Sequence, residues 1–270
     1  MRHFHLLALV AMTAALSLLI GCASQKGGLP NQAPAGSPPA ELANAEVDSD
    51  PDWQTFLEDD LDDDLDSDAD SVRDPIEAFN RLMFNFNDAL YTWMLRPVCQ
   101  GYRKVAPTPV RTGVKNFFHN LAAPIRFANC LLQGKGQAAS AEFVKFTINS
   151  IFGVLGFGNL TKDYPELNPD SEDLGQTLGS YGIGDGIYIV WPFIGSSTLR
   201  DTVGKLGEAP LVPRNYIQPP EASFTALGYE TINKLSFRIE DIDIARRATI
   251  DPYQAARNYY IKSRRARIMR

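Results

Sequence analysis

The chain has few of the side chains that catalysis and metal binding usually require. Its 270 residues include only three histidines and three cysteines. His3 and His5 precede Cys22, so a chain beginning at that cysteine keeps only His119. One histidine cannot supply a common zinc site without several other ligands, and no Gly-x-Ser-x-Gly nucleophile motif is present. The composition therefore argues against an enzyme, and we expect no metal site and no cofactor.

Two weaker candidates for chemistry do not complete a catalytic constellation. His119 lies among aromatic residues, where a packed or surface helical histidine competes with a catalytic one. Carboxylates gather in and just after a proline-rich loop, at Glu166, Asp170, Glu172 and Asp173. Pairs of such groups can do acid and base work, but nothing distinguishes these from solvated charges.

The sequence also lacks an apolar run long enough to cross a bilayer. Leu6–Ile20 is shorter than the ~20 residues that a spanning helix needs. It follows Arg2 and ends in Leu-Ile-Gly-Cys22, which predicts a lipoprotein signal peptide over residues 1–21. Cys22 would then carry diacylglycerol and an N-acyl chain, which together give stable anchoring. The alternative is an ordinary signal peptide with a chance cysteine. Ala23 follows the cysteine where Asp would favour the inner membrane, so we expect the outer membrane, periplasmic side.

Residues 22–73 have a composition that does not favour folding. The stretch 23–45 is rich in Pro, Gly, Ser, Asn and Ala, and 46–74 contains fourteen acidic residues against one base, Arg73. High charge with few apolar residues cannot offset the entropy of ordering a chain. We expect a disordered acidic linker that lets a lipid-anchored body stand off from the surface that holds it.

The remaining residues 74–270 form a basic body. Residues 75–270 contain 23 Lys and Arg against 17 Asp and Glu, although the whole chain carries −6. Most of the excess lies near the end, in Arg246, Arg247, Arg257, Lys262, Arg264, Arg265, Arg267 and Arg270. Such a helix suits anionic headgroups or an acidic partner surface, or it is a solvated face. Nucleic acid is excluded as a partner because a secreted lipoprotein does not normally meet it.

Two cysteines remain in the body, Cys99 and Cys130. An oxidising periplasm permits a disulfide, but two positions in a sequence do not establish its geometry. Buried thiols are the alternative.

Helical spacing dominates the body. Apolar residues recur from Ile76 to Met94 three and four apart, which predicts an amphipathic helix capped by Asp74, with Pro75 in its first turn, and ended by Pro97.

Further helices follow along the chain. Residues 110–132 predict two helices meeting just before Pro124. A third is predicted over 138–152, with Ala139, Phe143, Phe146 and Ile151 in its buried stripe. Helices resume at 199–206, 224–237 and 245–269, the last with Asp251-Pro252 as an internal start signal. The glycine-rich stretch 175–195 predicts loops, short helical turns and one short strand.

The segment 146–160 is uncharged and is interrupted by Gly153, Gly156 and Gly158. It is too short and too broken to cross a bilayer, and its glycines permit a sharp return of the backbone. It is an apolar hairpin that enters one leaflet, or it packs inside the body, as such apolar stretches commonly do.

Several motifs arrive in the order and approximate spacing of one known family. They include Asp74-Pro75 with Asn80-Arg81, Asn116–Leu121, Leu132–Lys135, and Gly175-Gln176 with Gly179. Over about residues 74–204 the chain resembles the MlaA (VacJ) family of outer-membrane phospholipid-transport lipoproteins.

The resemblance implies an all-α fold, a ring-like bundle of amphipathic helices lying in one membrane leaflet around an amphipathic channel. It implies removal of misplaced phospholipids from the outer leaflet and their transfer to the periplasmic carrier MlaC, often with a trimeric outer-membrane porin. Candidate lipid contacts in the channel or hairpin are Phe152, Gly153, Leu155, Gly156, Phe157, Lys162 and Arg200. A structural lipoprotein that braces a porin and a lipid hydrolase are the competing hypotheses.

Overall fold

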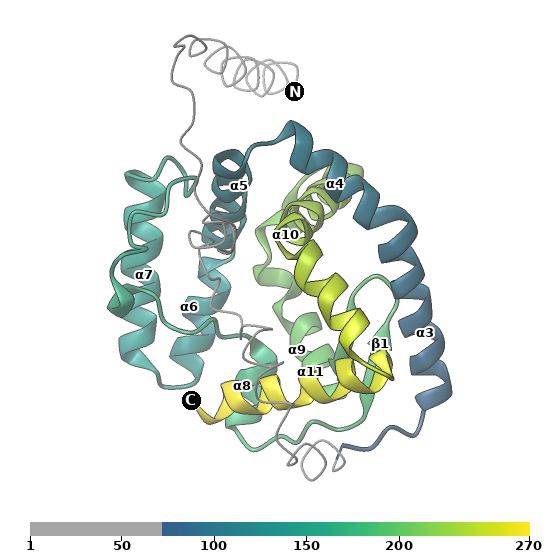
Figure 1. Cartoon of the computed structure of the whole chain (residues 1–270). Coiled ribbons are helices and arrows are strands. Elements are labelled where there is room, and N and C mark those ends of the chain that lie inside the picture. Colours follow the sequence, from purple (N-terminus) through teal and green to yellow (C-terminus); the bar gives the residue numbers. More distant parts are fainter. Residues whose placement is uncertain (1–71) are drawn as a thin grey trace, which may run out of the picture. The chain divides into compact units, whose positions relative to one another are not determined.

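The computed structural model describes residues 72–270. The predicted signal peptide, Cys22 and nearly all of the predicted linker lie outside the described residues. Within 72–270 the predicted all-α class is confirmed, and helices follow one another around the unit in a ring-like order, with α10 crossing the middle of the view (Figure 1). None of these helices is both long and apolar enough to cross a membrane.

The first helical segment is longer than predicted. Helix α3 (Glu77–Leu90) continues through a π-helical turn, η3 (Tyr91–Leu95), into α4 (Arg96–Val105). The prediction that Pro97 ends this helix is wrong. Pro97 lies in the first turn of α4, and in the widened turn before it Arg96 N–H donates to Tyr91 O, five residues back. Inside a continuous helix a proline removes one backbone hydrogen bond and crowds the carbonyl four residues back, and the widened turn before Pro97 accommodates both.

Asp74 does not cap this helix, contrary to the prediction. The N-cap position belongs to Ile76, which makes no side-chain capping bond. The Asp74 carboxylate instead accepts hydrogen bonds from Asn80 Nδ2 at 2.7 Å and from the Tyr253 hydroxyl. A long-range contact has therefore replaced a local one.

The prediction of two helices around Pro124 is confirmed. Helix α5 (Thr108–Leu121) is followed by α6 (Ala123–Leu132), with Pro124 in its first turn, and then by α7 (Gly136–Ile151). Helices α6 and α7 pack against each other as an antiparallel pair (Figure 1).

The glycine-rich region contains more regular structure than predicted. A 3₁₀ turn (Pro165–Leu167) and helix α8 (Leu174–Ser180) precede an antiparallel hairpin of β1 (Tyr188–Trp191) and β2 (Gly195–Thr198). Tyr188 pairs with Thr198 and Trp191 with Gly195, so the single predicted strand is one half of a pair.

Asparagine side chains complete the other edge of β1. Asn80 accepts from Val190 N–H at 2.8 Å and donates to Tyr188 O at 2.9 Å. Two turns further along α3, Asn87 bonds Phe193 N–H and Trp191 O in the same manner. Because unpaired backbone groups are costly when buried, these amides substitute for a third strand.

The C-terminal part is helical, as predicted. It contains α9 (Leu199–Glu208), two 3₁₀ turns (Ala209–Leu211 and Pro213–Tyr216), α10 (Pro220–Ala248) and α11 (Pro252–Met269). Asp251 caps α11 by accepting from the N–H groups of Tyr253 and Gln254, which confirms the predicted start signal. Residues 245–248, predicted in the last helix, belong to α10.

The apolar core is small. It joins Val72, the hairpin residues Tyr188 and Val190, and Tyr253 and Ile261 of α11. This cluster holds α11 against the hairpin.

Candidate functional site

Helix α7 presents its polar side to the interior. Glu142, Lys145 and Asn149 are buried, whereas Phe143 is 57% exposed and Ile151 66% exposed. Of the predicted buried stripe, Ala139 is buried and Phe146 half-buried, but the prediction is wrong for Phe143 and Ile151. Apolar side chains face outward where a water-soluble helix would place charges.

The interior polar groups are paired. Arg126 of α6 donates to both carboxylate oxygens of Glu142, from Nε at 3.0 Å and from Nη2 at 2.9 Å. Asn129 donates to Glu208 at 2.9 Å and accepts from Thr177. Among the described residues more polar and charged side chains than apolar ones are buried.

The predicted hairpin follows directly after α7. Gly156 N–H donates to Asn149 O at 2.8 Å and Gly158 N–H to Gly153 O at 2.7 Å, so the backbone returns over the end of the helix. A Cβ on Gly153 would lie 2.3 Å from Gly158 O. Gly156, at φ +92°, could not carry one either, because it would lie 2.5 Å from Asn120 Cβ. Gly153 and Gly156, two of the three predicted hairpin glycines, are therefore required by close approach.

The tip of the hairpin is apolar and exposed. Phe152 is 71% exposed and Leu155 67% exposed, with Val154 beside them. Val154 and Leu155 have φ of 53° and 59°, which is costly for residues with large side chains. The alternative of core packing is therefore wrong for the tip of this segment. Phe157 is partly covered by Phe117, with ring centroids 4.9 Å apart.

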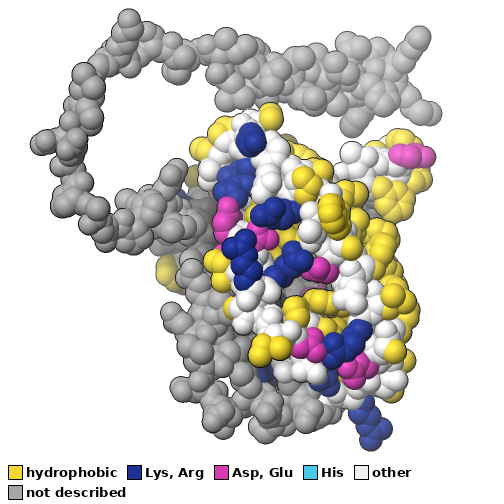
Figure 2. Space-filling view, turned by 45° about the vertical axis from the view of Figure 1, so that its right-hand side comes forward, with side chains coloured by type: hydrophobic (Ala, Val, Ile, Leu, Met, Phe, Trp, Pro, Cys, Tyr) yellow, Lys and Arg dark blue, Asp and Glu magenta, His cyan; other side chains and the backbone are white. Residues whose placement is uncertain are grey.

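A second apolar surface runs along α3 and its continuation. Phe79, Leu82, Phe86 and Trp93 are exposed at helical spacing. Figure 2 shows hydrophobic side chains toward the right edge of this face, and lysines and arginines gathered with a few carboxylates across its middle. Exposed large apolar side chains that share one face of a helix are candidates for an interaction site.

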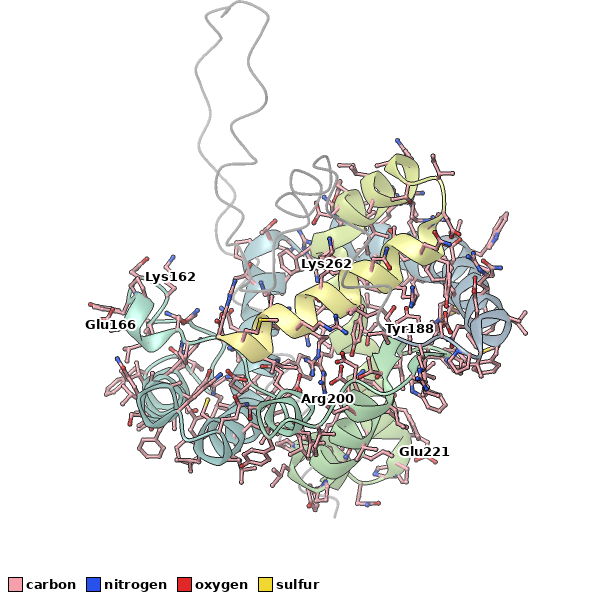
Figure 3. The ribbon with its side chains drawn as sticks, turned by 90° about the horizontal axis from the view of Figure 1, so that it is seen from below. Lys162, Glu166, Tyr188, Arg200, Glu221 and Lys262 are labelled. Atoms are coloured by element: carbon pink, nitrogen blue, oxygen red, sulfur yellow. The ribbon has the colours of Figure 1, made fainter. Side chains whose placement is uncertain are left out.

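The two charged residues among the predicted lipid contacts, Lys162 and Arg200, differ in their surroundings. Lys162 is exposed and, like Glu166, points away from the body (Figure 3). Arg200 lies beneath α11, buried, with Nη2 2.8 Å from Asp185 Oδ1 and Nε 3.3 Å from Asp201 Oδ1. Because Arg200 is committed to two carboxylates, this geometry favours a structural role for it over contact with a headgroup.

Two arginines of the basic terminal helix are engaged by acidic groups of the body, so this helix is not a wholly solvated face. Arg264 is buried between Asp173 and Asp201, and Arg265 pairs with Asp185 at 3.2 Å. Burial alone would raise the pKa of both Asp173 and Asp201, but Arg264 outweighs it and the pKa of each carboxyl is lowered. Arg264 and Arg265 thus dock α11 onto acidic groups of the body.

The residues of the family motif cluster where α11 packs against the body. A Cβ on Gly175 would lie 2.5 Å from Asp201 Oδ1, and one on Gly179 would lie 2.6 Å from Ile268 Cδ1. Gln176 N–H donates to Asp173, the N-cap of α8. Arg81 pairs with Asp251 at 2.9 Å and lies over the Tyr253 ring. Together with Asp74 and Asn80, these residues hold α11 in place.

No catalytic constellation is formed by the candidates for chemistry. Burial and neighbouring Arg126 lower the pKa of His119 to about 2, so it is a neutral packed side chain. Glu172 pairs with Lys135 at 2.7 Å, and Asp170 with Arg270. Within residues 72–270 no group of three or more His, Cys, Asp and Glu side chains could hold a metal ion.

Cys99 and Cys130 are both buried as free thiols. Burial raises the pKa of each, that of Cys130 to about 11. The alternative of a disulfide is therefore wrong for this structure.

Sequence reasoning missed the buried charges of α6 and α7, Arg126, Glu142 and Lys145. The signal for them was present, because Glu142, Lys145 and Asn149 recur three and four residues apart. These features define a class of protein: a helical one with charged groups inside and apolar groups outside, as expected of proteins surrounded by lipid.

Comparison with known proteins gives the family. The family model described as MlaA lipoprotein matches residues 72–267. The chain is 36% identical over 194 residues to the intermembrane phospholipid transport system lipoprotein MlaA of Shigella flexneri and to its namesake in Escherichia coli K12, covering 70% of this chain and 76% of each relative. The chain belongs to the MlaA lipoprotein family. Membership places it among lipoproteins of intermembrane phospholipid transport.

A solved structure has a similar fold. It comes from work on the structural basis for maintenance of bacterial outer membrane lipid asymmetry. The two structures share a TM-score of 0.64 at 31% identity, over 71% of this chain and 97% of that one.

Proposed function

We propose that this protein removes misplaced phospholipids from the outer leaflet of the outer membrane and passes them to a periplasmic carrier, which maintains lipid asymmetry. The observation that carries the proposal is the inverted polarity of α7 and the hairpin. Glu142, Lys145 and Asn149 face inward, while Phe143, Phe152 and Leu155 face outward.

This polarity suits a body that lies in one leaflet. Apolar side chains on the outside avoid the cost that charges would incur against acyl chains. A path with polar walls spares a headgroup the unfavourable crossing of hydrocarbon while the tails stay in apolar surroundings. The protein thereby guides a lipid without making or breaking a bond, and direction follows from the relative stability of the lipid in its source and its acceptor.

Anchoring and partners complete the proposal. Diacylglycerol and an N-acyl chain on Cys22 would hold the protein on the periplasmic side of the outer membrane. The carrier corresponds to MlaC, and a trimeric porin would support the protein in the membrane. The exposed stripe of α3 and the hairpin offer apolar surfaces for lipid or for such a partner.

The test is the amount of phospholipid in the outer leaflet of cells that lack the protein. We expect phospholipid to accumulate there and to return to its normal level when the gene is restored. An unchanged outer leaflet, together with reduced stability of a porin, would favour the structural lipoprotein. Release of fatty acid by the purified protein would favour a hydrolase.

A further inference from the structure

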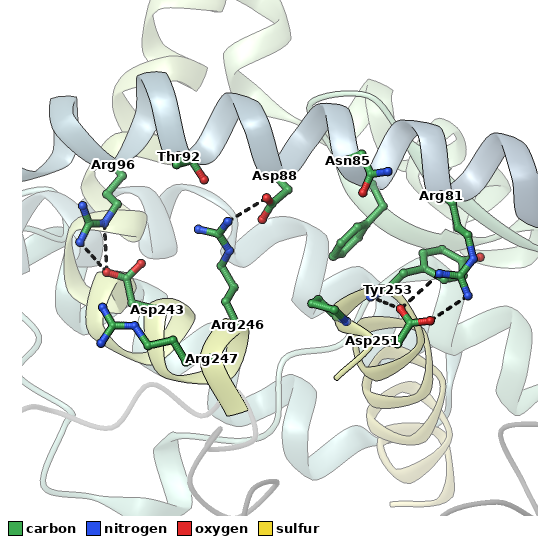
Figure 4. A pocket seen from close by; sticks show the side chains of 12 residues that line it. Arg81, Asn85, Asp88, Thr92, Arg96, Asp243, Arg246, Arg247, Asp251 and Tyr253 are labelled. Atoms are coloured by element: carbon green, nitrogen blue, oxygen red, sulfur yellow. Dashed lines mark hydrogen bonds and ion pairs between the residues drawn. The ribbon is translucent and has the colours of Figure 1, made fainter. Parts of the chain in front are cut away.

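A charged cavity lies where α3 and its π turn meet the end of α10 and the start of α11 (Figure 4). Its volume is about 470 Å³, within the range of small-molecule sites. It is lined by side chains of both charge signs together with aromatic and small polar ones: Arg81, Phe84, Asn85, Asp88, Thr92, Arg96, Asp243, Arg246, Arg247, Asp251, Pro252 and Tyr253.

Three of its four arginines are neutralised by three aspartates. Arg81 pairs with Asp251 at 2.9 Å. Arg96 pairs with Asp243 and Arg246 with Asp88, each at 2.8 Å (Figure 4).

The fourth arginine, Arg247, has no partner. Across residues 72–270 no hydrogen bond or ion pair engages its exposed guanidinium. The lining therefore carries a net charge of about +1, which complements one anionic group.

Thr92 provides a second unsatisfied group in the same cavity. Other helical threonines in this part of the chain donate their hydroxyl to the carbonyl four residues back, as Thr147, Thr225 and Thr231 do at 2.7–2.8 Å. Thr92 lies in the π turn, and its buried Oγ1 has no partner among the described residues. A buried hydroxyl without a partner is costly, and π turns are frequent at functional sites.

We infer that this cavity binds a phosphodiester, the charged group of a phospholipid headgroup. Arg247 would donate charge-assisted hydrogen bonds to the phosphate oxygens and Thr92 a further one, while the three existing ion pairs hold the surrounding walls. Because three arginines of the lining are already paired with aspartates, the remaining positive charge suits a single phosphodiester. The inference rests on the proposed function for its lipid source, because free phosphate offers the same oxygens.

The experiment uses the purified full-length lipoprotein in maltoside micelles. Calorimetry compares glycerophosphoglycerol, inorganic phosphate and glycerol, and mass spectrometry measures the phospholipid that co-purifies. We expect glycerophosphoglycerol to bind and glycerol not to. Arg247→Ala should weaken binding roughly tenfold and Thr92→Val about threefold, since each removes donors to the anion. Arg247→Ala should also lower the co-purified phospholipid.

Lys104→Ala is the matched control. Lys104, like Arg247, is an exposed cation in the last turn of its helix with no partner among the described residues, so its loss has the same effect on a helix end. Equal affinity in Arg247→Ala and Lys104→Ala would overturn the site. Equally tight binding of inorganic phosphate, with co-purified phospholipid unchanged in Arg247→Ala, would contradict the inference that the bound phosphate belongs to a lipid. These readouts are separate from the cell assay, so a failed transport function would be recognised as such.

Discussion

Arg126 of α6 and Glu142 of α7 face each other in a two-pronged ion pair that is sealed from solvent, with side chains 7% and 1% exposed. A planar guanidinium that meets both oxygens of one carboxylate fixes the relative position of two helices as well as their charge. The pair thus joins α7, the helix before the hairpin, to α6. The apolar side chains of α7 face outward at this point.

Breaking this pair should be strongly destabilising. Glu142→Gln leaves Arg126 buried without its counter-charge, which should lower the free energy of unfolding by ~3–5 kcal/mol. Denaturant unfolding in micelles gives the value. Glu240→Gln is the control, because it breaks the exposed pair with Arg103 and should cost no more than ~1 kcal/mol. Equal costs for the two variants would show that the burial of the pair does not matter.

The hairpin glycines should not accept a methyl group. Gly156→Ala would force a Cβ to 2.5 Å from Asn120 Cβ at a φ of +92°, so we expect a loss of ~2 kcal/mol or more and a loosened hairpin. Gly101→Ala is the control, since a Cβ added at this position, in the middle of α4, would have nothing within 4 Å. It should stabilise the protein by ~0.5–1 kcal/mol. Limited proteolysis and thermal unfolding measure both effects, and a fully tolerated Gly156→Ala would contradict the packing described for this turn.

The exposed hairpin tip should bind membranes by itself. In a chain that lacks residues 1–21 and carries Cys22→Ala, which removes the proposed site of lipidation, Leu155→Asp should weaken liposome binding roughly tenfold or more, because a buried leucine contributes ~1.5–3 kcal/mol. Flotation with phospholipid vesicles measures this. Ile250→Asp, at an exposed position between α10 and α11, should leave binding unchanged. A comparable loss in the two variants would mean that the hairpin has no special part in membrane contact.

Local signals in the sequence were sufficient for many of the helices. Pro124 and Asp251-Pro252 act on their own neighbours, so the helix boundaries near them could be predicted. Asp74 has the residue type and position of a cap, but a tyrosine 179 residues away takes its carboxylate. Partners so distant in sequence leave no local pattern.

The orientation of α7 was harder to predict for a different reason. Periodicity defines two faces of a helix, and assigning the apolar face to the interior assumes water outside. The polar repeat of Glu142, Lys145 and Asn149 faces the interior here. The period is therefore correct, but the prediction assigns the wrong face of the helix to the interior. The hairpin was located correctly from its glycines, while the exposure of its tip depends on the surrounding medium.

Acid should destabilise the protein through His119. Its folded pKa, lowered to about 2 by burial and by Arg126, lies below the unfolded value of 6.5, so the unfolded state binds the proton more tightly. The contribution of the neutral His119 to the free energy of unfolding is fully present above pH 6.5, and it declines as the pH falls from there toward 2. The slope should approach, and not exceed, ~1.4 kcal/mol per pH unit for this one group. Unfolding free energies between pH 7.5 and 5 measure it, a range above the ordinary pKa values of the carboxyl groups. His119→Gln should flatten the slope, because no other histidine remains after Cys22. A slope that survives this substitution would assign the acid sensitivity to other groups.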